Sequence, residues 1–384
     1  MSDNDTTTTG PTRRDTIKYG GAVIAGGALA GCADESDTGG DSGTEDGSYT
    51  VEMSPVGEVG FDSVPERVAA YDDQWADAMV ALGQADRLVA HGRPGNLITT
   101  FYDQLPGVSI DADSLTKLSD NMSLETFYEL DADVHHIDPY RAVSTWDAID
   151  EEAVERLRND VGPLFANRYS ARRNYNGDES YQYYSIWELT NKFAELYQVE
   201  DRATELKTVY DEMVADIQSQ LPPKEERPRV AISVHYQGTF YAQPGPLGPG
   251  FARAHTRPLA PRDTFADYPE YSTVGATYDM ETMAEVDPDV FIQALGIQFS
   301  DRIGAIKNPE DGTVAAEVTA FENGRVYNGG TNYQGPLYTL FQTEMTAKQI
   351  YPELFGEWQG LGNTPESEQL FDRQRVADII NGEI

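Results

Sequence analysis

The chain has 384 residues, with 65 acidic and 28 basic side chains and a net charge of −37. This balance leaves no basic stripe to meet phosphates, so it excludes a nucleic-acid partner. An acidic disordered chain is excluded as well, because 10% of the residues are aromatic and apolar periodicity persists throughout. The acidic side chains of a folded protein with this charge repel one another in dilute salt. Molar salt shortens the Debye length to about 3 Å and removes that repulsion. The composition therefore indicates a halophilic protein of haloarchaeal type.

The first residues predict export and a lipid anchor. A twin-arginine segment and an apolar run of 13 residues precede the sequence Leu29-Ala30-Gly31-Cys32. The run is shorter than the roughly 20 residues that span a membrane, so residues 1–31 are predicted to be a signal peptide of the twin-arginine route. Cys32 stands where a lipobox cysteine receives diacylglycerol; an ordinary cleavable signal is the alternative. Residues 32–48 are acidic and small, which predicts a solvated tether.

The next part of the chain alternates strands with helices, which predicts a parallel sheet. We expect an entry strand pair within residues 49–62, strands at 68–71, 88–91 and 134–137, and helices at 75–82 and from 124. We assign residues 49–198 to an N-terminal lobe.

A long amphipathic helix is predicted next. Apolar side chains recur at three- and four-residue spacings between residues 203 and 221, and two prolines follow. About 20 residues at 1.5 Å each make a rod of roughly 30 Å. We assign residues 199–222 to a connecting helix, whose stiffness predicts only small closure motions.

One segment of the chain occurs twice. LETFYELDADV at residues 124–134 reappears as METMAEVDPDV at residues 280–290. The separation is far longer than a solenoid period, so it indicates two copies of one domain. Residues 223–384 are assigned to a C-terminal lobe that closes with a strand at 324–327 and a helix at 337–351. The sequence thus predicts an α/β protein with two doubly wound lobes, one joining helix and a ligand cleft between the lobes.

These features together resemble a known family. Ser63-Val64-Pro65-Glu66-Arg67-Val68, the repeated Leu-Asp-Ala-Asp-Val unit, Val326-Tyr327 and Tyr351-Pro352-Glu353-Leu354-Phe355 are similar to segments of ABC-importer substrate-binding proteins. The resemblance is to the family that receives ferric siderophores, haem and cobalamin, and it covers residues 61–355. It implies a monomeric, non-enzymatic receptor on the outer face of the membrane, without a cofactor, that delivers an iron chelate to a permease. Haem or a corrinoid is the alternative cargo.

Ligands of open parallel sheets lie beyond the carboxyl ends of the strands, and this rule selects ten candidate residues. Aromatic faces suit a planar or catecholate ligand, and arginine forks suit its anionic oxygens. The candidates are Tyr71, Trp75, Arg93, Tyr140 and Arg141 in the first lobe and His235, Tyr236, Gln298, Arg302 and Tyr333 in the second.

The resemblance also implies a docking role for two glutamates. Glu125 and Glu281 occupy the same position in the two copies of the repeat. Receptors of this family present one surface glutamate per lobe to the permease, whereas stabilisation of a helix N-terminus is the structural alternative.

Other function classes find little support. His135 and His136 are adjacent on a strand and point to opposite faces, so we expect no metal site there. A bare-metal receptor needs converging histidines and carboxylates, and only His91 and His235 stand at expected cleft positions. A secreted enzyme is disfavoured, because the sequence contains no nucleophile elbow, zinc-protease motif or phosphate loop in a strand-turn-helix context. A purely structural surface protein does not explain the duplicated lobes.

Overall fold

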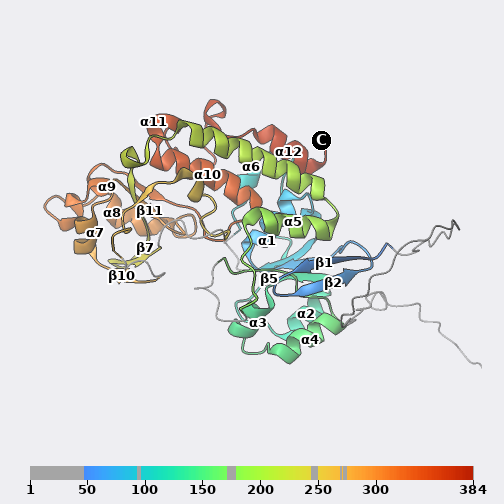
Figure 1. Cartoon of the computed structure of the whole chain (residues 1–384). Helices are drawn as coiled ribbons and strands as arrows, with labels where there is room; N and C mark the ends of the chain where they lie inside the picture. Colours follow the sequence, from blue (N-terminus) through green and yellow to red (C-terminus); the bar gives the residue numbers. More distant parts are fainter. Residues whose placement is uncertain are drawn as a thin grey trace, which may run out of the picture.

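The computed structural model describes residues 47–92, 97–170, 179–243, 250–268, 270 and 275–383. Two α/β lobes lie side by side, and the helix α6 (Glu200–Gln220) runs along both (Figure 1). The expected architecture of two lobes joined by one long helix is therefore confirmed. No helix in the described ranges is long and apolar enough to span a membrane.

The N-terminal lobe begins with the antiparallel pair β1 (Tyr49–Met53) and β2 (Gly57–Phe61), as predicted. Its main sheet is parallel, in the order β5-β4-β3-β6. The strands are β3 (Val68–Ala70), β4 (Leu88–Gly92), β5 (Thr116–Leu118) and β6 (Val134–His136). The helices are α1 (Asp73–Ala81), α2 (Leu124–Leu130), α3 (Pro139–Thr145), α4 (Glu151–Asp160) and α5 (Ile186–Tyr197).

The C-terminal lobe has a mixed sheet with a parallel centre, β7-β11-β12. β7 (Arg229–Tyr236) turns back into antiparallel β8 (Thr239–Ala242) through Gln237 and Gly238, both at positive φ. Two such residues are typical of a tight hairpin, which the repeat alone does not predict. The remaining elements are β9 (Arg262–Asp263), β10 (Thr277–Tyr278), β11 (Val290–Gln293), β12 (Val326–Asn328), α7 (Met280–Val286), α8 (Gly304–Lys307) and α9 (Thr319–Glu322).

The repeated Asp-x-Asp ties the end of a helix to the start of a central strand, β3 in one lobe and β7 in the other. In the N-terminal copy Asp131 ends α2 in the left-handed conformation, with φ of 47°. The Asp133 carboxylate accepts the backbone N–H of Arg67 at 2.9 Å, just before β3. The Arg67 side chain in turn donates to the Leu130 and Asp131 carbonyls, which the helix leaves without partners.

The C-terminal copy repeats this arrangement. Asp287 ends α7 at φ of 41°, and Asp289 accepts the N–H of Arg229 at 2.7 Å. The Arg229 side chain donates to the Val286 and Asp287 carbonyls. The duplicated sequence is therefore a duplicated structural connection, and it includes the arginine at the start of β3 or β7.

The adjacent histidines of β6 are both structural. His136 lies between the Phe165 carbonyl and the Tyr197 hydroxyl, at 2.9 and 2.6 Å, and His135 packs edge-on to Phe127. Burial lowers the pKa of His135 to about 4 and that of His136 to about 3, so both are neutral at pH 7.

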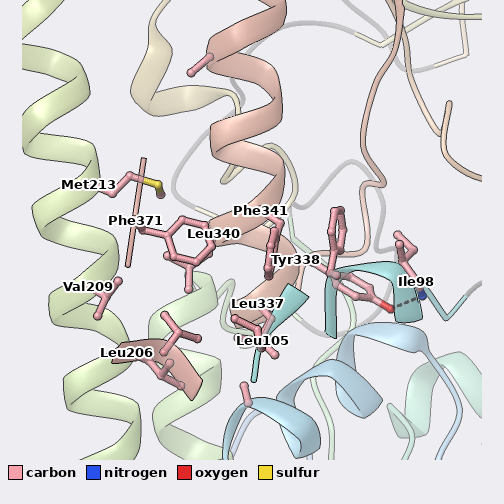
Figure 2. Packing of buried hydrophobic residues seen from close by; sticks show 14 of the residues in the cluster. Ile98, Leu105, Leu206, Val209, Met213, Leu337, Tyr338, Leu340, Phe341 and Phe371 are labelled. Atoms are coloured by element: carbon pink, nitrogen blue, oxygen red, sulfur yellow. Dashed lines mark hydrogen bonds between the residues drawn. The ribbon is translucent and has the colours of Figure 1, made fainter. Parts of the chain in front are cut away.

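The last helices pack back across the lobe junction. α10 (Pro336–Ile350) continues into α11 (Pro352–Phe355), and α12 (Arg373–Asn381) follows. α10 contacts α1 and α6, and its apolar side chains share one core with residues of both lobes (Figure 2). The assignment of residues 223–384 to the second lobe misses this return.

A buried carboxylate holds that junction. Asp77 of α1 is fully buried, and its Oδ2 accepts the backbone N–H groups of Leu337 and Tyr338 at 2.9 and 3.2 Å. Its Oδ1 accepts the hydroxyl of Tyr102 at 3.0 Å. Asp77 thus caps the N-terminus of α10 from another helix. Gly335 is required there, because a Cβ atom would lie 2.1 Å from Asp77 Oδ2.

We predict a pH-dependent contribution of Asp77 to stability. Burial raises the pKa of Asp77 to about 7, against hydrogen bonds that lower it. Because the folded pKa exceeds that of the unfolded chain, this contribution is fully present below pH about 4 and is lost as pH rises through about 7. The variant Asp77→Asn has a neutral cap at every pH and does not lose this contribution. The free energy of unfolding of the variant, minus that of wild type, should therefore increase by about 3 kcal/mol between pH about 4.5 and about 7.5.

Chemical unfolding in molar KCl at several pH values measures this difference. Asp103→Asn is the matched control, since Asp103 is exposed on the neighbouring turn. A constant difference between wild type and Asp77→Asn across this range would contradict the assignment.

Candidate ligand-binding site

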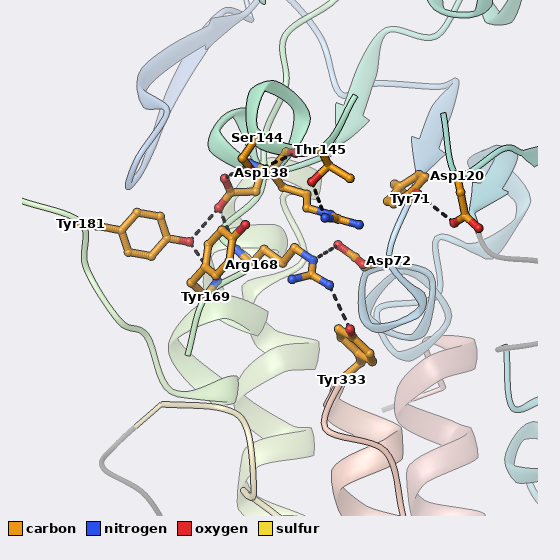
Figure 3. Close-up of polar contacts among 11 residues, drawn as sticks. Tyr71, Asp72, Asp120, Asp138, Ser144, Thr145, Arg168, Tyr169, Tyr181 and Tyr333 are labelled. Carbon is orange, nitrogen blue, oxygen red and sulfur yellow. Dashed lines mark hydrogen bonds and ion pairs between the residues drawn. The ribbon is translucent and has the colours of Figure 1, made fainter. Parts of the chain in front are cut away.

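The two lobes meet in a polar cluster around Arg168 (Figure 3). We call Asp72, Asp138, Arg168, Tyr181 and Tyr333 the interlobe cluster. Arg168 Nε donates to Asp72 Oδ2 at 3.0 Å, and its Nη2 donates to the Tyr333 hydroxyl at 3.0 Å. Asp72 and Arg168 belong to the N-terminal lobe, and Tyr333 follows β12 of the C-terminal lobe. The guanidinium therefore bridges the lobes.

Asp138 sets the position of Arg168. It is fully buried at the N-terminus of α3, where Oδ1 accepts the backbone N–H of Arg141 at 3.1 Å. Its Oδ2 accepts the backbone N–H of Arg168 at 2.9 Å and the hydroxyl of Tyr181 at 2.7 Å. One carboxylate thus ties together three segments of the chain, and the Arg168 side chain starts from a fixed backbone.

Aromatic rings line the N-terminal side of the cluster. Tyr140 and Tyr169 meet edge-on with centroids 5.5 Å apart, and Tyr169 meets Tyr181 at 5.9 Å. The Arg168 guanidinium lies 5.6 Å from the Tyr169 ring and 5.1 Å from the Tyr333 ring. Edge-on ring pairs and cation–π contacts make a rigid surface with few free rotamers.

The electrostatics of the cluster follow from burial. Burial lowers the pKa of Arg168, but the neighbouring Asp72 carboxylate and other partners raise it by more. The net pKa is above its ordinary value, so the guanidinium stays charged. Burial raises the pKa of Asp138 despite its hydrogen bonds. Burial and the nearby Asp138 carboxyl raise the pKa of Tyr181, so its hydroxyl remains a donor at neutral pH.

A second aromatic and cationic surface lies on the C-terminal lobe. Arg302 stacks 4.6 Å from the ring centroid of Tyr236 and 3.7 Å from that of Phe299. Tyr236 and Phe299 are 44% and 36% exposed, which is unusual for large aromatic side chains. Tyr236 ends β7, and the other two residues follow β11, so all three lie at the carboxyl edge of this sheet.

The structure brings several of the predicted site residues together. Tyr333 belongs to the interlobe cluster, and Tyr140 extends its aromatic side. The backbone N–H of Arg141 donates to Asp138. Tyr236 and Arg302 form the second surface. Gln298 is half-buried in the turn before Arg302, and its Oε1 has no partner among the residues that the structure describes.

Three of the predicted ligand contacts are buried in the structure. Trp75 is 1% exposed and packs on Phe193 in the core of the first lobe. Tyr71 is fully buried with its ring 4.8 Å from that of Trp146. His235 is 6% exposed, lies 4.8 Å from the Phe240 ring and hydrogen-bonds the Arg302 carbonyl. Position after a strand does not decide which way a side chain faces: Tyr71 follows β3, His235 lies near the end of β7, and Trp75 is in α1.

Two other assignments lie outside the described residues. Arg93 falls between residues 92 and 97, and Cys32 precedes residue 47.

The sequence reading missed Asp72, Asp138, Arg168, Tyr169 and Tyr181 as site residues. Leu164 pairs with His135 of β6 as one more parallel strand segment, and Arg168 follows it. In the second lobe β12 pairs with β11 in the same way, and Tyr333 follows it.

Among the described residues, no group of three or more His, Cys, Asp or Glu side chains could hold a metal ion. Glu125 and Glu281 are exposed in the first turns of α2 and α7. Their positions therefore leave both the docking and the helix-stabilising roles open.

Comparison with known proteins identifies the fold. No protein-family model and no curated protein matches the chain. A periplasmic binding protein of Veillonella parvula is similar in structure, with a TM-score of 0.59 and 15% identity over 83% of this chain and 95% of that one.

Two further solved structures are similar. One is an ABC-type Fe3+-hydroxamate transport system of Saccharomonospora viridis, with a TM-score of 0.53 and 18% identity over 80% of this chain and 99% of that one. The other is the periplasmic haem-binding protein HutB of Vibrio cholerae, with a TM-score of 0.52 and 14% identity over 74% and 99%. The chain thus has the two-lobed α/β fold of periplasmic binding proteins.

Proposed function

We propose that the protein is the extracytoplasmic substrate-binding receptor of an ABC importer and that it captures an iron chelate, a ferric siderophore, between its lobes. The observation that carries the proposal is Arg168, which bridges Asp72 and Tyr333 and has the rings of Tyr169 and Tyr333, one from each lobe, beside its guanidinium. The proposed role is capture and delivery of the chelate.

The chemistry of the site suits such a ligand. Arg168 Nη1 donates to no residue that the structure describes, and the Arg302 guanidinium contacts only aromatic rings among them. These N–H groups can bind oxygen atoms of a chelate, and the tyrosine rings can pack on its organic frame. One of the similar structures is an Fe3+-hydroxamate transport system and another is a haem-binding protein, which supports the same class of cargo.

Our first functional prediction concerns ligand affinity. Arg168→Ala should weaken binding of the cognate ferric chelate by about tenfold to a hundredfold, because a charged hydrogen bond contributes about 1.5–3 kcal/mol. Tyr169→Ala should also weaken it, through lost packing against the ligand. Titration calorimetry of the purified domain in molar KCl, against a panel of ferric chelates, haem and cobalamin, measures both effects.

Arg156→Ala is the matched control, since Arg156 is exposed on α4 away from the cluster. Wild-type binding of cobalamin or haem without any ferric siderophore would replace the proposed cargo. Equal affinity in wild type, Arg168→Ala and Tyr169→Ala would remove the ligand from this site.

We further propose that Glu125 and Glu281 dock the receptor on its permease. Both carboxylates are exposed, one on each lobe. Exposed ion pairs contribute only about 0–1 kcal/mol and weaken in salt, so the contact needs desolvation or apolar neighbours such as Leu124 and Met280.

The double variant Glu125→Ala, Glu281→Ala should bind the chelate normally and abolish its uptake by cells. Glu129→Ala, Glu285→Ala removes the same charge from the ends of the same helices and serves as the control. Normal uptake by the first variant would leave helix stabilisation as the role of these residues, and lost ligand binding would place them at the ligand.

The N-terminal sequence supports a membrane-anchored receptor. We propose that the twin-arginine segment directs export and that Cys32 carries the lipid. Cys32→Ser should leave the protein unprocessed or release it into the medium, which cell fractionation and the mass of the mature protein would reveal. An unchanged membrane fraction with unchanged processing would contradict the anchor.

A further inference from the structure

We propose that Asp72 sets the charge preference of the interlobe site, so that the site favours iron chelates of low net charge, such as trihydroxamates, over polyanionic tricatecholates. This inference rests on the proposed function and specifies its class of ligand.

The first observation is the burial and the geometry of the ion pair. Asp72 Oδ2 lies 3.0 Å from Arg168 Nε, and the side chains are 3% and 13% exposed. The Arg168 guanidinium is thus neutralised by a fixed partner before any ligand arrives. The ion pair of Asp72 and Arg168 has no net charge. A ligand therefore meets the remaining N–H donors of Arg168 rather than an unpaired positive charge.

The second observation is that Asp72 does not perform the role that its position favours. It is the N-cap residue of α1, where an aspartate usually accepts a backbone N–H of the first turn. Here the Asp72 side chain forms no capping hydrogen bond and turns to Arg168 instead. The helix forgoes its cap in favour of the ion pair, which points to a role of Asp72 in the site.

The surroundings reinforce this balance. Asp138, the second buried carboxyl of the interlobe cluster, accepts the backbone N–H of Arg168 and so fixes where the side chain starts. Among the described residues, Asp72 is the carboxylate that pairs with the guanidinium itself. Charges at such depth are screened by salt far less than surface charges, so the balance persists in molar salt.

Ferric chelates differ strongly in charge. Three hydroxamates, each with one negative charge, neutralise Fe3+, and their complex presents neutral oxygen acceptors. Three catecholates, each with two negative charges, leave a complex of charge −3. A buried aspartate repels the second complex through a medium of low effective dielectric constant but interacts weakly with the first.

The test compares two probes of similar size, ferrichrome as the neutral trihydroxamate and ferric enterobactin as the tricatecholate. Asp72→Asn removes the charge while keeping the shape of the side chain. Wild type should bind ferrichrome more tightly, and Asp72→Asn should shift the ratio of the two dissociation constants at least tenfold toward ferric enterobactin. Asp62→Asn, which removes an exposed charge after β2, should leave the ratio unchanged.

The ratio separates charge from structure, because a misplaced Arg168 would weaken both probes together. An unchanged ratio in Asp72→Asn, or tighter binding of ferric enterobactin by wild type, would overturn the inference while leaving the receptor function intact. Failure of wild type to bind either probe or any other ferric chelate would instead contradict the proposed function itself.

Discussion

The rest of the structure depends on the contact between Asp77 and the N-terminus of α10. A helix N-terminus carries unpaired N–H groups and a partial positive charge, and burying it without an acceptor is costly. Asp77 supplies that acceptor from α1 of the first lobe, 260 residues earlier in the chain. Because α10 starts at Pro336, three residues after Tyr333, this cap also restricts where Tyr333 lies.

The interlobe site follows from this junction. Asp72 precedes α1, and Tyr333 precedes α10, so the packing of these two helices brings both residues to the same end of the molecule. Arg168 then meets them from its own strand segment, held by Asp138. A further contact ties the lobes beside it, since the N–H of Ala252 donates to Ser170 Oγ at 2.9 Å. Together with the single helix α6, these ties are consistent with small relative movements of the lobes.

The sequence predicted the lobes well because their strands and helices carry local signals. The repeated segment, the stripe on α6 and the strand pair at the start were all readable. The sequence does not predict the structural role of the repeat, the hydrogen bond between Arg67 and Asp133, because these residues come together only when the sheet forms.

The site was harder to read for a physical reason. α1 and α10 are buried along their whole lengths, so neither shows a polar face that would orient it. The sequence therefore predicts Trp75 at the ligand, although its side chain faces the core. Asp77, two residues further along α1, holds the lobe junction. Arg168 follows a strand segment of only a few residues, too short to show alternation. Its importance arises from partners far apart in the chain, Asp72 and Tyr333.

The central claim is that an iron chelate is held between the lobes beside Arg168. A crystal structure of the protein grown with a bound ferric chelate tests it most directly, because anomalous scattering locates the iron without any assumption about the ligand. The account predicts one iron peak between the Arg168–Tyr333 bridge and the surface of Tyr236 and Arg302. An iron peak on the outer surface of either lobe, with Arg168 and Tyr333 unaltered and free of ligand, would contradict it.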